Sequence, residues 1–125
     1  MAVSAREVQV LSQLSYLYLL QGYHERAMVI YAGLLVLQPR QVRHLRGLAL
    51  ACSRAGHHEK ALTALDQLAL LGAVDAPFYS LRARVLTDLG REAEARAAMR
   101  TCLQFKSKSA SQALAAPQTS RVTRS

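Results

Sequence analysis

The sequence is poor in the residues that stiffen or cross-link a chain. Its 125 residues include no tryptophan, three prolines and two cysteines. This composition argues against a collagen-like or broadly disordered chain, and the absence of a CxxC pair or histidine cluster argues against a disulfide framework or structural zinc site. About half of the residues are apolar, which suits one helical domain with a modest core.

Long hydrophobic runs and leader features are also missing. No apolar run, 32–37 included, approaches the length needed to span a bilayer. Arg6 and Glu7 interrupt the apolar core that a signal peptide requires. We therefore expect a cytoplasmic protein, with no membrane insertion.

Acidic residues are few. The formal net charge is +8, from 16 Lys and Arg against 8 Asp and Glu. Half of this excess comes from four cations after residue 105, namely Lys106, Lys108, Arg121 and Arg124. The rest of the chain suits an acidic protein partner as readily as nucleic acid, but the basic tail lacks the interleaved aromatic residues typical of nucleic-acid binding. A protein partner is therefore the favoured interpretation.

Catalytic and cofactor-binding motifs are absent as well. There is no phosphate-binding glycine loop, no HExxH and no GxSxG elbow. His24, His57 and His58 fall in the expected turns, and His44 has no carboxylate or cysteine partner at a useful spacing. We expect no enzyme activity, no cofactor, no metal and no small-molecule substrate.

What the sequence does contain is a repeat of 34 residues. A glycine marks each copy, and an alanine follows it five residues later: Gly22 and Ala27, Gly56 and Ala61, Gly90 and Ala95. The intervening segments GYHERA, GHHEKA and GREAEA are versions of one turn. A period of this length indicates stacked supersecondary units.

The register extends in both directions from the glycines. Its columns hold Leu11, Leu45 and Tyr79; Ser15, Ala49 and Ala83; Tyr18, Cys52 and Leu86; Tyr31, Leu65 and Met99; and Leu34, Leu68 and Cys102. These columns resemble the tetratricopeptide (TPR) pattern of W-x2-L-G-x2-Y, then A-x3-F, then P, with Leu in place of Trp. An ordinary helical bundle with evenly spaced glycines is the alternative, and the coincident small residues disfavour it.

Each column has a physical reason. Small residues on both helices of a hairpin let the helices approach closely, and the glycine ends the first helix by accepting a positive φ. Cys52 and Cys102 occupy interior columns, so we expect small apolar core residues. Pro39 ends the first hairpin, and Asp75 with Pro77 is typical of a capped helix start.

The junction between the second and third repeats departs from the pattern. Arg82 stands where the first two repeats carry Leu14 and Leu48, and Ala73 replaces the terminal proline. We expect a less regular junction, with Leu81 taking the vacated apolar role.

The repeat predicts an all-α fold of three TPR helical hairpins stacked as a short right-handed superhelix. The domain is expected over 6–105, with repeats at about 8–41, 42–75 and 76–105, and helices at about 6–21, 24–37, 41–55, 58–71, 77–89 and 92–105. Residues 106–125 are predicted to be a basic, Ser/Ala-rich, flexible tail. Because a repeat array exposes one face of its last unit, either 110–116 folds back as a weak cap or a partner or second copy covers that face.

In this architecture the first helices of the hairpins line a concave groove. The predicted groove residues are Ser12, Tyr16, Leu19 and Leu20; Arg43, Arg46, Leu50 and Arg54; and Ser80, Arg84, Thr87 and Asp88. Such a groove is apolar at one end and cationic in the middle, which suits a peptide with apolar anchors and acidic groups. The alternative is that Leu19 and Leu20 pack against the next hairpin and the arginines form a solvated face.

The chain resembles the small TPR chaperones of bacterial type III secretion. The first repeat, LSQLSYLYLLQGYHERAMVIYAGLLVLQP, is similar to the opening of the SctY (YscY) family, with an apolar helix, a Gly turn, then Arg-Ala and a leucine-rich helix. The resemblance covers about 8–105. The tail after Phe105 has no counterpart in these families, and the long N-terminal helical extension of the translocator chaperones is absent.

This resemblance implies a cytoplasmic export chaperone that binds a small secreted, SctX-like partner in its groove and engages the export gate with it. It implies no nucleotide or metal, and a homodimer is possible without the partner. A needle-subunit or translocator chaperone of the same system, and a general TPR interaction scaffold, remain alternatives.

Overall fold

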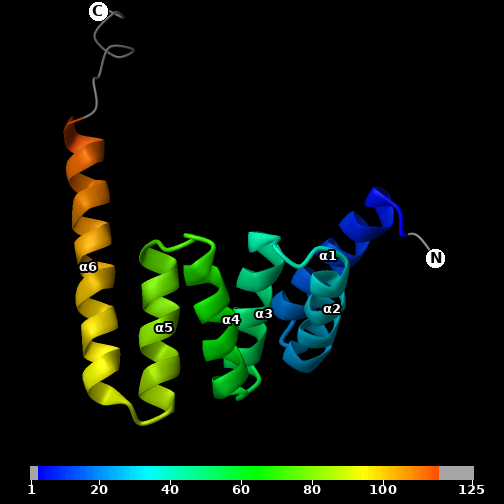
Figure 1. The fold of residues 1–125 in the computed structure, drawn as a ribbon, viewed down its shortest axis with the longest axis horizontal. Coiled ribbons are helices and arrows are strands. Elements are labelled where there is room, and N and C mark those ends of the chain that lie inside the picture. The colour runs from blue at the N-terminus through cyan, green and yellow to red at the C-terminus, as the bar shows by residue number, and fades with distance from the viewer. Residues whose placement is uncertain (1–2, 116–125) are drawn as a thin grey trace, which may run out of the picture.

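In the computed structural model, which describes residues 3–115, the chain consists of helices joined by short turns. The helices are α1 Ala5–Leu20, α2 His24–Leu37, α3 Val42–Arg54, α4 His58–Leu70, α5 Ala76–Asp88 and α6 Glu92–Ala115. They pair in chain order as three hairpins that stand side by side (Figure 1). The predicted all-α fold of stacked TPR hairpins is confirmed.

The predicted boundaries agree to within one residue for the first five helices. For α6 the prediction was wrong, because the helix continues from Phe105 to Ala115. The segment 106–115 is polar but contains neither proline nor glycine, so nothing in it ends a helix. It extends straight past α5 and does not fold back as a cap (Figure 1). Residues 116–125 of the predicted tail lie outside the described residues, and so does the last residue of the predicted cap, Ala116.

The turn within each hairpin repeats the same geometry. Gly22, Gly56 and Gly90 have φ of 87°, 85° and 78°. In each turn the N–H after the glycine donates to the carbonyl five residues earlier: Tyr23 to Tyr18 at 2.9 Å, His57 to Cys52 at 2.8 Å, and Arg91 to Leu86 at 2.8 Å. This is the glycine C-cap that satisfies the last carbonyls of a helix.

Small residues lie where the helices of each hairpin meet. Ala27 and Ala61 are fully buried and Ala95 is 6% exposed. The small residues on the first helices are buried to the same degree: Ser15, Ala49 and Ala83. A larger side chain at these positions would force the two backbones apart. The equivalence of the small-residue positions, predicted from the repeat, is therefore confirmed.

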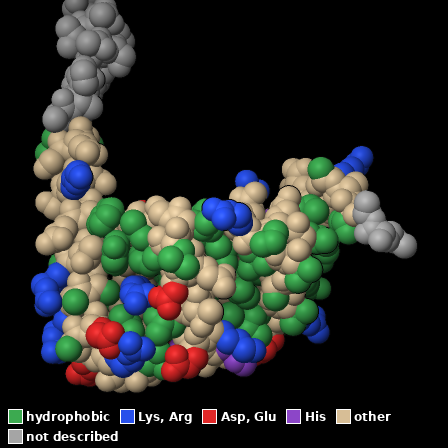
Figure 2. All heavy atoms as spheres, viewed as in Figure 1, with side chains coloured by type: hydrophobic (Ala, Val, Ile, Leu, Met, Phe, Trp, Pro, Cys, Tyr) green, Lys and Arg blue, Asp and Glu red, His purple; other side chains and the backbone are tan. Residues whose placement is uncertain are grey.

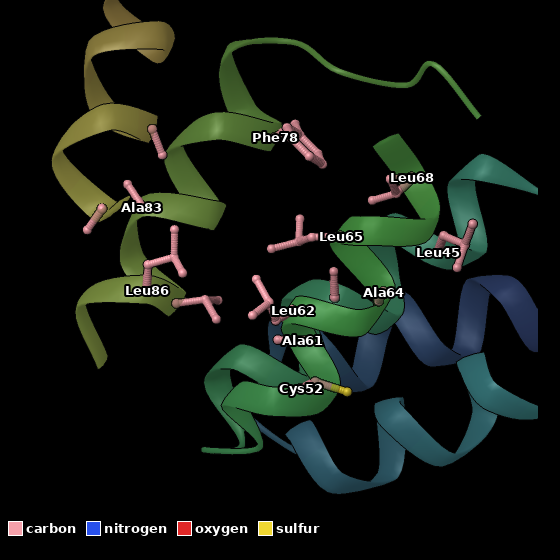
Figure 3. Packing of buried hydrophobic residues seen from close by; sticks show 14 residues of the cluster. Leu45, Cys52, Ala61, Leu62, Ala64, Leu65, Leu68, Phe78, Ala83 and Leu86 are labelled. Atoms are coloured by element: carbon pink, nitrogen blue, oxygen red, sulfur yellow. The ribbon is translucent and has the colours of Figure 1, made fainter. Parts of the chain in front are cut away.

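The hairpins join one another in two different ways. At the first junction the Tyr31 ring of α2 lies directly on Gly47 of α3. At the second, longer side chains fill the space, since Leu62 and Leu65 of α4 point toward α5 and Leu86 lies opposite them (Figure 3). A tyrosine ring packed on a glycine thus joins the first two hairpins, and interdigitated leucine side chains join the second and third.

Polar contacts supplement the second junction. The Arg82 guanidinium lies 3.0 Å from the Asp66 carboxylate of α4, which explains how an arginine occupies a position that is leucine in the other repeats. Across the same junction, His58 Nδ1 lies 3.7 Å from a carboxylate oxygen of Asp88. Leu81 packs against the core, as predicted. On the face in Figure 2, charged side chains gather toward the edge formed by the hairpin turns.

Both cysteines are core residues, as predicted. Cys52 and Cys102 are each 1% exposed and free of disulfides. Burial raises the pKa of the Cys52 thiol, so the thiol stays protonated and behaves as a small apolar group.

The contact between Tyr31 and Gly47 leads to the first prediction. A methyl group added at Gly47 would overlap the Tyr31 ring, whereas one added at Gly33 would meet no atom within 4 Å. We expect Gly47→Ala to lower the free energy of unfolding by about 1–3 kcal/mol through overpacking. Gly33→Ala should raise it by about 0.5–1 kcal/mol through helix propensity. Urea unfolding followed by circular dichroism measures both, and an equal gain in stability for the two variants would contradict the packing described.

Candidate partner-binding groove

The candidate groove residues form columns across the first helices of the hairpins. Residues that are 34 positions apart occupy equivalent places on α1, α3 and α5. Three such columns carry most of the predicted groove: Ser12, Arg46 and Ser80; Tyr16, Leu50 and Arg84; and Leu20, Arg54 and Asp88. Within one helix the three columns are four residues apart, so they lie on one face.

The α1 end of this surface is apolar. Tyr16 and Leu20 are one helical turn apart, and their exposed fractions are 56% and 63%. Leu20 therefore does not pack against the next hairpin. Side chains of this kind become energetic anchors when a partner covers them.

Leu19 does not line the groove, and the prediction for this residue was wrong. It is 3% exposed and belongs to the core cluster that includes Ala51 of α3. Its column continues through Ser53, which is also buried, to Thr87. Thr87 is exposed, because no hairpin in the described part of the chain follows the third. This column thus faces along the stack, away from the groove.

The positive charge along α3 is spread out and partly neutralised. Arg43 and Arg54 are both exposed, and eleven residues of helix separate them by about 16 Å. Between them, Arg46 lies 3.0 Å from the Asp75 carboxylate. Burial, with a smaller contribution from the charge of Arg43, lowers the pKa of His44, so its imidazole is neutral at pH 7. The cationic groups available to a partner are Arg43, Arg54 and Arg84, which form no ion pair with any described residue.

A cleft of about 230 Å³ opens between α3 and α5. Its lining residues are Arg46, Ala49, Leu50, Leu65, Leu68, Pro77, Phe78 and Leu81. Sequence reasoning found Arg46 and Leu50 but missed the contribution of α5. The signal was the pair Pro77 and Phe78, which replaces Arg43 and His44 of the preceding repeat and makes the α5 wall of the cleft apolar.

A second hollow, of about 450 Å³, lies on the opposite face between α2 and α4. It is mainly apolar, and α3 forms its floor through Leu48 and Cys52. Val29 on its rim is 67% exposed. No repeat motif predicts this hollow, because it depends on the spacing between the second helices and not on any single repeat.

Neither a metal centre nor a membrane span is found in residues 3–115. No cluster of three or more His, Cys, Asp or Glu side chains there is suited to hold a metal ion. No helix in the same range combines the length and apolar character needed to cross a bilayer.

Comparison with known families agrees with the geometry. The family model described as tetratricopeptide repeat matches residues 42–67 and 76–101, which fall on the second and third hairpins. The second and third hairpins are tetratricopeptide repeats. No curated protein matches the chain. The first hairpin, outside the matched segments, has the same glycine turn and buried alanine as the other two.

Tetratricopeptide repeats build scaffolds for protein–protein interaction. The matched repeats therefore indicate that the protein binds another protein. The exposed groove with its apolar end, its cleft and its arginines is the candidate binding site.

Asp75 links the groove to the stability of the stack. One carboxylate oxygen accepts a hydrogen bond from the Phe78 N–H at 2.9 Å and caps α5, and the other pairs with Arg46. We expect Asp75→Ala to lower the free energy of unfolding by about 1–2 kcal/mol, because the cap is lost. Asp75→Asn keeps the cap and loses only a half-exposed ion pair, so the cost should stay below about 1 kcal/mol. If urea unfolding showed equal losses for both variants, the ion pair and not the cap would hold this junction.

Proposed function

We propose that this protein binds an extended or helical segment of a protein partner along the groove. The observation that carries the proposal is the exposure of Tyr16 and Leu20 in line with an apolar cleft and with arginines that have no ion-pair partner among the described residues. Apolar side chains of the segment would cover Tyr16 and Leu20 and enter the cleft. Carboxylates would reach Arg43, Arg54 and Arg84.

The two kinds of contact contribute differently. Burying a large apolar side chain contributes about 1.5–3 kcal/mol, whereas an exposed ion pair contributes about 1 kcal/mol or less. The apolar anchors therefore supply most of the affinity. The arginines steer the acidic segment and fix its direction along the groove, and their contribution falls as the salt concentration rises.

We further propose that the partner is a small secreted substrate of a type III secretion system, of the SctX kind, and that the protein is its cytoplasmic export chaperone. The resemblance of the first repeat to the SctY family supports this assignment. The mechanism is sequestration: an aggregation-prone amphipathic segment is buried against the repeats until export, which stabilises both proteins by mass action. The alternatives are a needle-subunit or translocator chaperone of the same system, and a general TPR interaction scaffold outside secretion.

The test combines co-expression with a matched set of variants. The protein is co-expressed with small secreted candidates from its host, and copurification and solubility of each candidate are scored. We expect the triple variant Arg43→Glu, Arg54→Glu, Arg84→Glu to raise the Kd at least about tenfold, equivalent to 1.4 kcal/mol. Circular dichroism should stay unchanged because all three side chains are exposed. Tyr16→Ala with Leu20→Ala should weaken binding further, because the apolar anchors are lost.

The pair Arg26→Glu, Lys60→Glu on α2 and α4 changes exposed charges away from the groove and is the control. Unchanged affinity in the groove variants would remove the groove proposal. If no small secreted protein copurifies or becomes soluble, the chaperone assignment is withdrawn and the scaffold alternative replaces it.

A further inference from the structure

The end of the stack at α6 has the shape of an unfilled junction. In the first hairpin, Leu19, Ala27 and Tyr31 form a buried cluster with Ala51 of the next first helix, α3. In the second hairpin, Ala61 and Leu65 lie in the cluster that contains Val85 of α5. Ala51 and Val85 are 34 residues apart, so the same position of the incoming helix fills the same place on the hairpin before it.

The equivalent place on the third hairpin is empty in the described part of the chain. Its residues by register are Thr87, Ala95 and Met99. Met99 is 42% exposed, whereas Tyr31 and Leu65 in the same column are 4% and 1% exposed. A hollow of about 270 Å³ remains between α5 and α6, and it is lined by Ala83, Thr87, Glu92, Ala95, Arg96 and Met99. We call this hollow the end face.

An apolar stripe continues from the end face along α6. Met99, Leu103, Ala110 and Leu114 are spaced by four, seven and four residues, which keeps them on one side of a helix. Leu103 and Leu114 are 57% and 85% exposed. The 24 residues of α6 are about 36 Å long and the 13 of α5 about 20 Å, so the stripe extends about 16 Å past α5. This extension stands clear of the rest of the molecule (Figures 1 and 2).

After its first turn, which holds Glu92 and Glu94, α6 is basic, and this charge determines which partner the end face binds. From Ala95 to Ala115 the helix contains four Lys and Arg and no acidic residue. Arg100 is equivalent by register to Asp66, and Asp66 pairs with Arg82 of the helix packed on it at 3.0 Å. A charged group at this position therefore reaches the neighbouring helix. With arginine in place of aspartate, the group required on the incoming helix is a carboxylate.

We propose that the end face docks an amphipathic helix of an acidic partner protein. The helix carries a small or β-branched apolar residue that fills the hollow, as Ala51 and Val85 do in the other junctions. Its flanking carboxylates pair with Arg96 and Arg100. This surface is separate from the groove, and the proposal does not rest on the function proposed above.

A second copy of the chain fits this surface less well. The opposite end of the stack offers Leu17, 48% exposed, in the column of Ala51 and Val85. At the position of Arg82, however, α1 carries Leu14 and offers no carboxylate. The only acid of α1, Glu7, already accepts a hydrogen bond from the Ser4 N–H in the helix cap. Two copies of net charge +8 also repel each other.

Two labelled helical peptides test the proposal on the full chain. Both repeat the apolar spacing of Phe78, Leu81 and Val85 in α5, and one carries Glu and the other Lys at the position of Arg82 and at the flanks. In fluorescence anisotropy we expect the Glu peptide to bind at least about tenfold more tightly than the Lys peptide. Met99→Glu and the pair Arg96→Glu, Arg100→Glu should each remove this binding with unchanged circular dichroism. The triple groove variant should bind the Glu peptide like the unmodified chain.

Equal binding of the two peptides, or binding unaffected by the α6 variants, would overturn the proposal. Loss of binding only in the groove variant would do the same, since the peptide would then occupy the groove. Sedimentation velocity covers the remaining case. Oligomers of the free chain that both Leu17→Glu and Met99→Glu abolish would assign the end face to a second copy, and the acidic partner would be excluded as its occupant.

Discussion

Close approach of helices at small side chains is the constraint on which the structure depends. Ala27, Ala61 and Ala95 are almost completely buried at equivalent places, and a glycine turn with positive φ brings each of them there. Because every hairpin is closed in the same way, residues 34 positions apart fall into columns. Each column lies in one part of the molecule: the core, the groove or an end of the stack.

The two junctions between hairpins show how local departures from the repeat shape the groove. Tyr31 against Gly47 brings α2 and α3 into close contact. At the second junction, Leu62 and Leu65 keep α4 and α5 further apart, and Arg82 and Asp75 add polar contacts at its edges. The cleft lies across this second junction, so the cleft is a consequence of the looser contact between α4 and α5. Binding and stability share residues there, because Asp75 caps α5 and also pairs with Arg46.

The fold could be predicted almost entirely from the sequence, because spacing alone identifies the turns and the tight contacts. Five helices, the buried cysteines and the role of Leu81 followed from the register. The length of α6 did not, since polar residues such as Ser107 and Ser109 suggest a tail although nothing in the segment ends a helix.

The groove could be predicted only in part. Leu19 and Leu20 are adjacent in the sequence, and a rotation of about 100° between neighbouring residues puts one in the core and the other on the surface. Telling them apart requires knowing which face the next hairpin covers. The pairing of Arg46 with Asp75 and the cleft beside them depend on the distance between hairpins, which no repeat motif specifies. Thr87 differs for another reason: its column, with Leu19 and Ser53, faces along the stack, and no described hairpin packs on Thr87.

The stability of Ala61→Leu relative to Ala69→Leu tests the central constraint most directly. Both alanines lie on α4, but Ala61 is fully buried between helices and Ala69 is exposed. If small residues set the hairpin spacing, urea unfolding will show a loss of about 1–3 kcal/mol or more for Ala61→Leu and a change within about 0.5 kcal/mol for Ala69→Leu. Equal stability of the two variants would contradict the account, because the hairpins would then close without the tight contact.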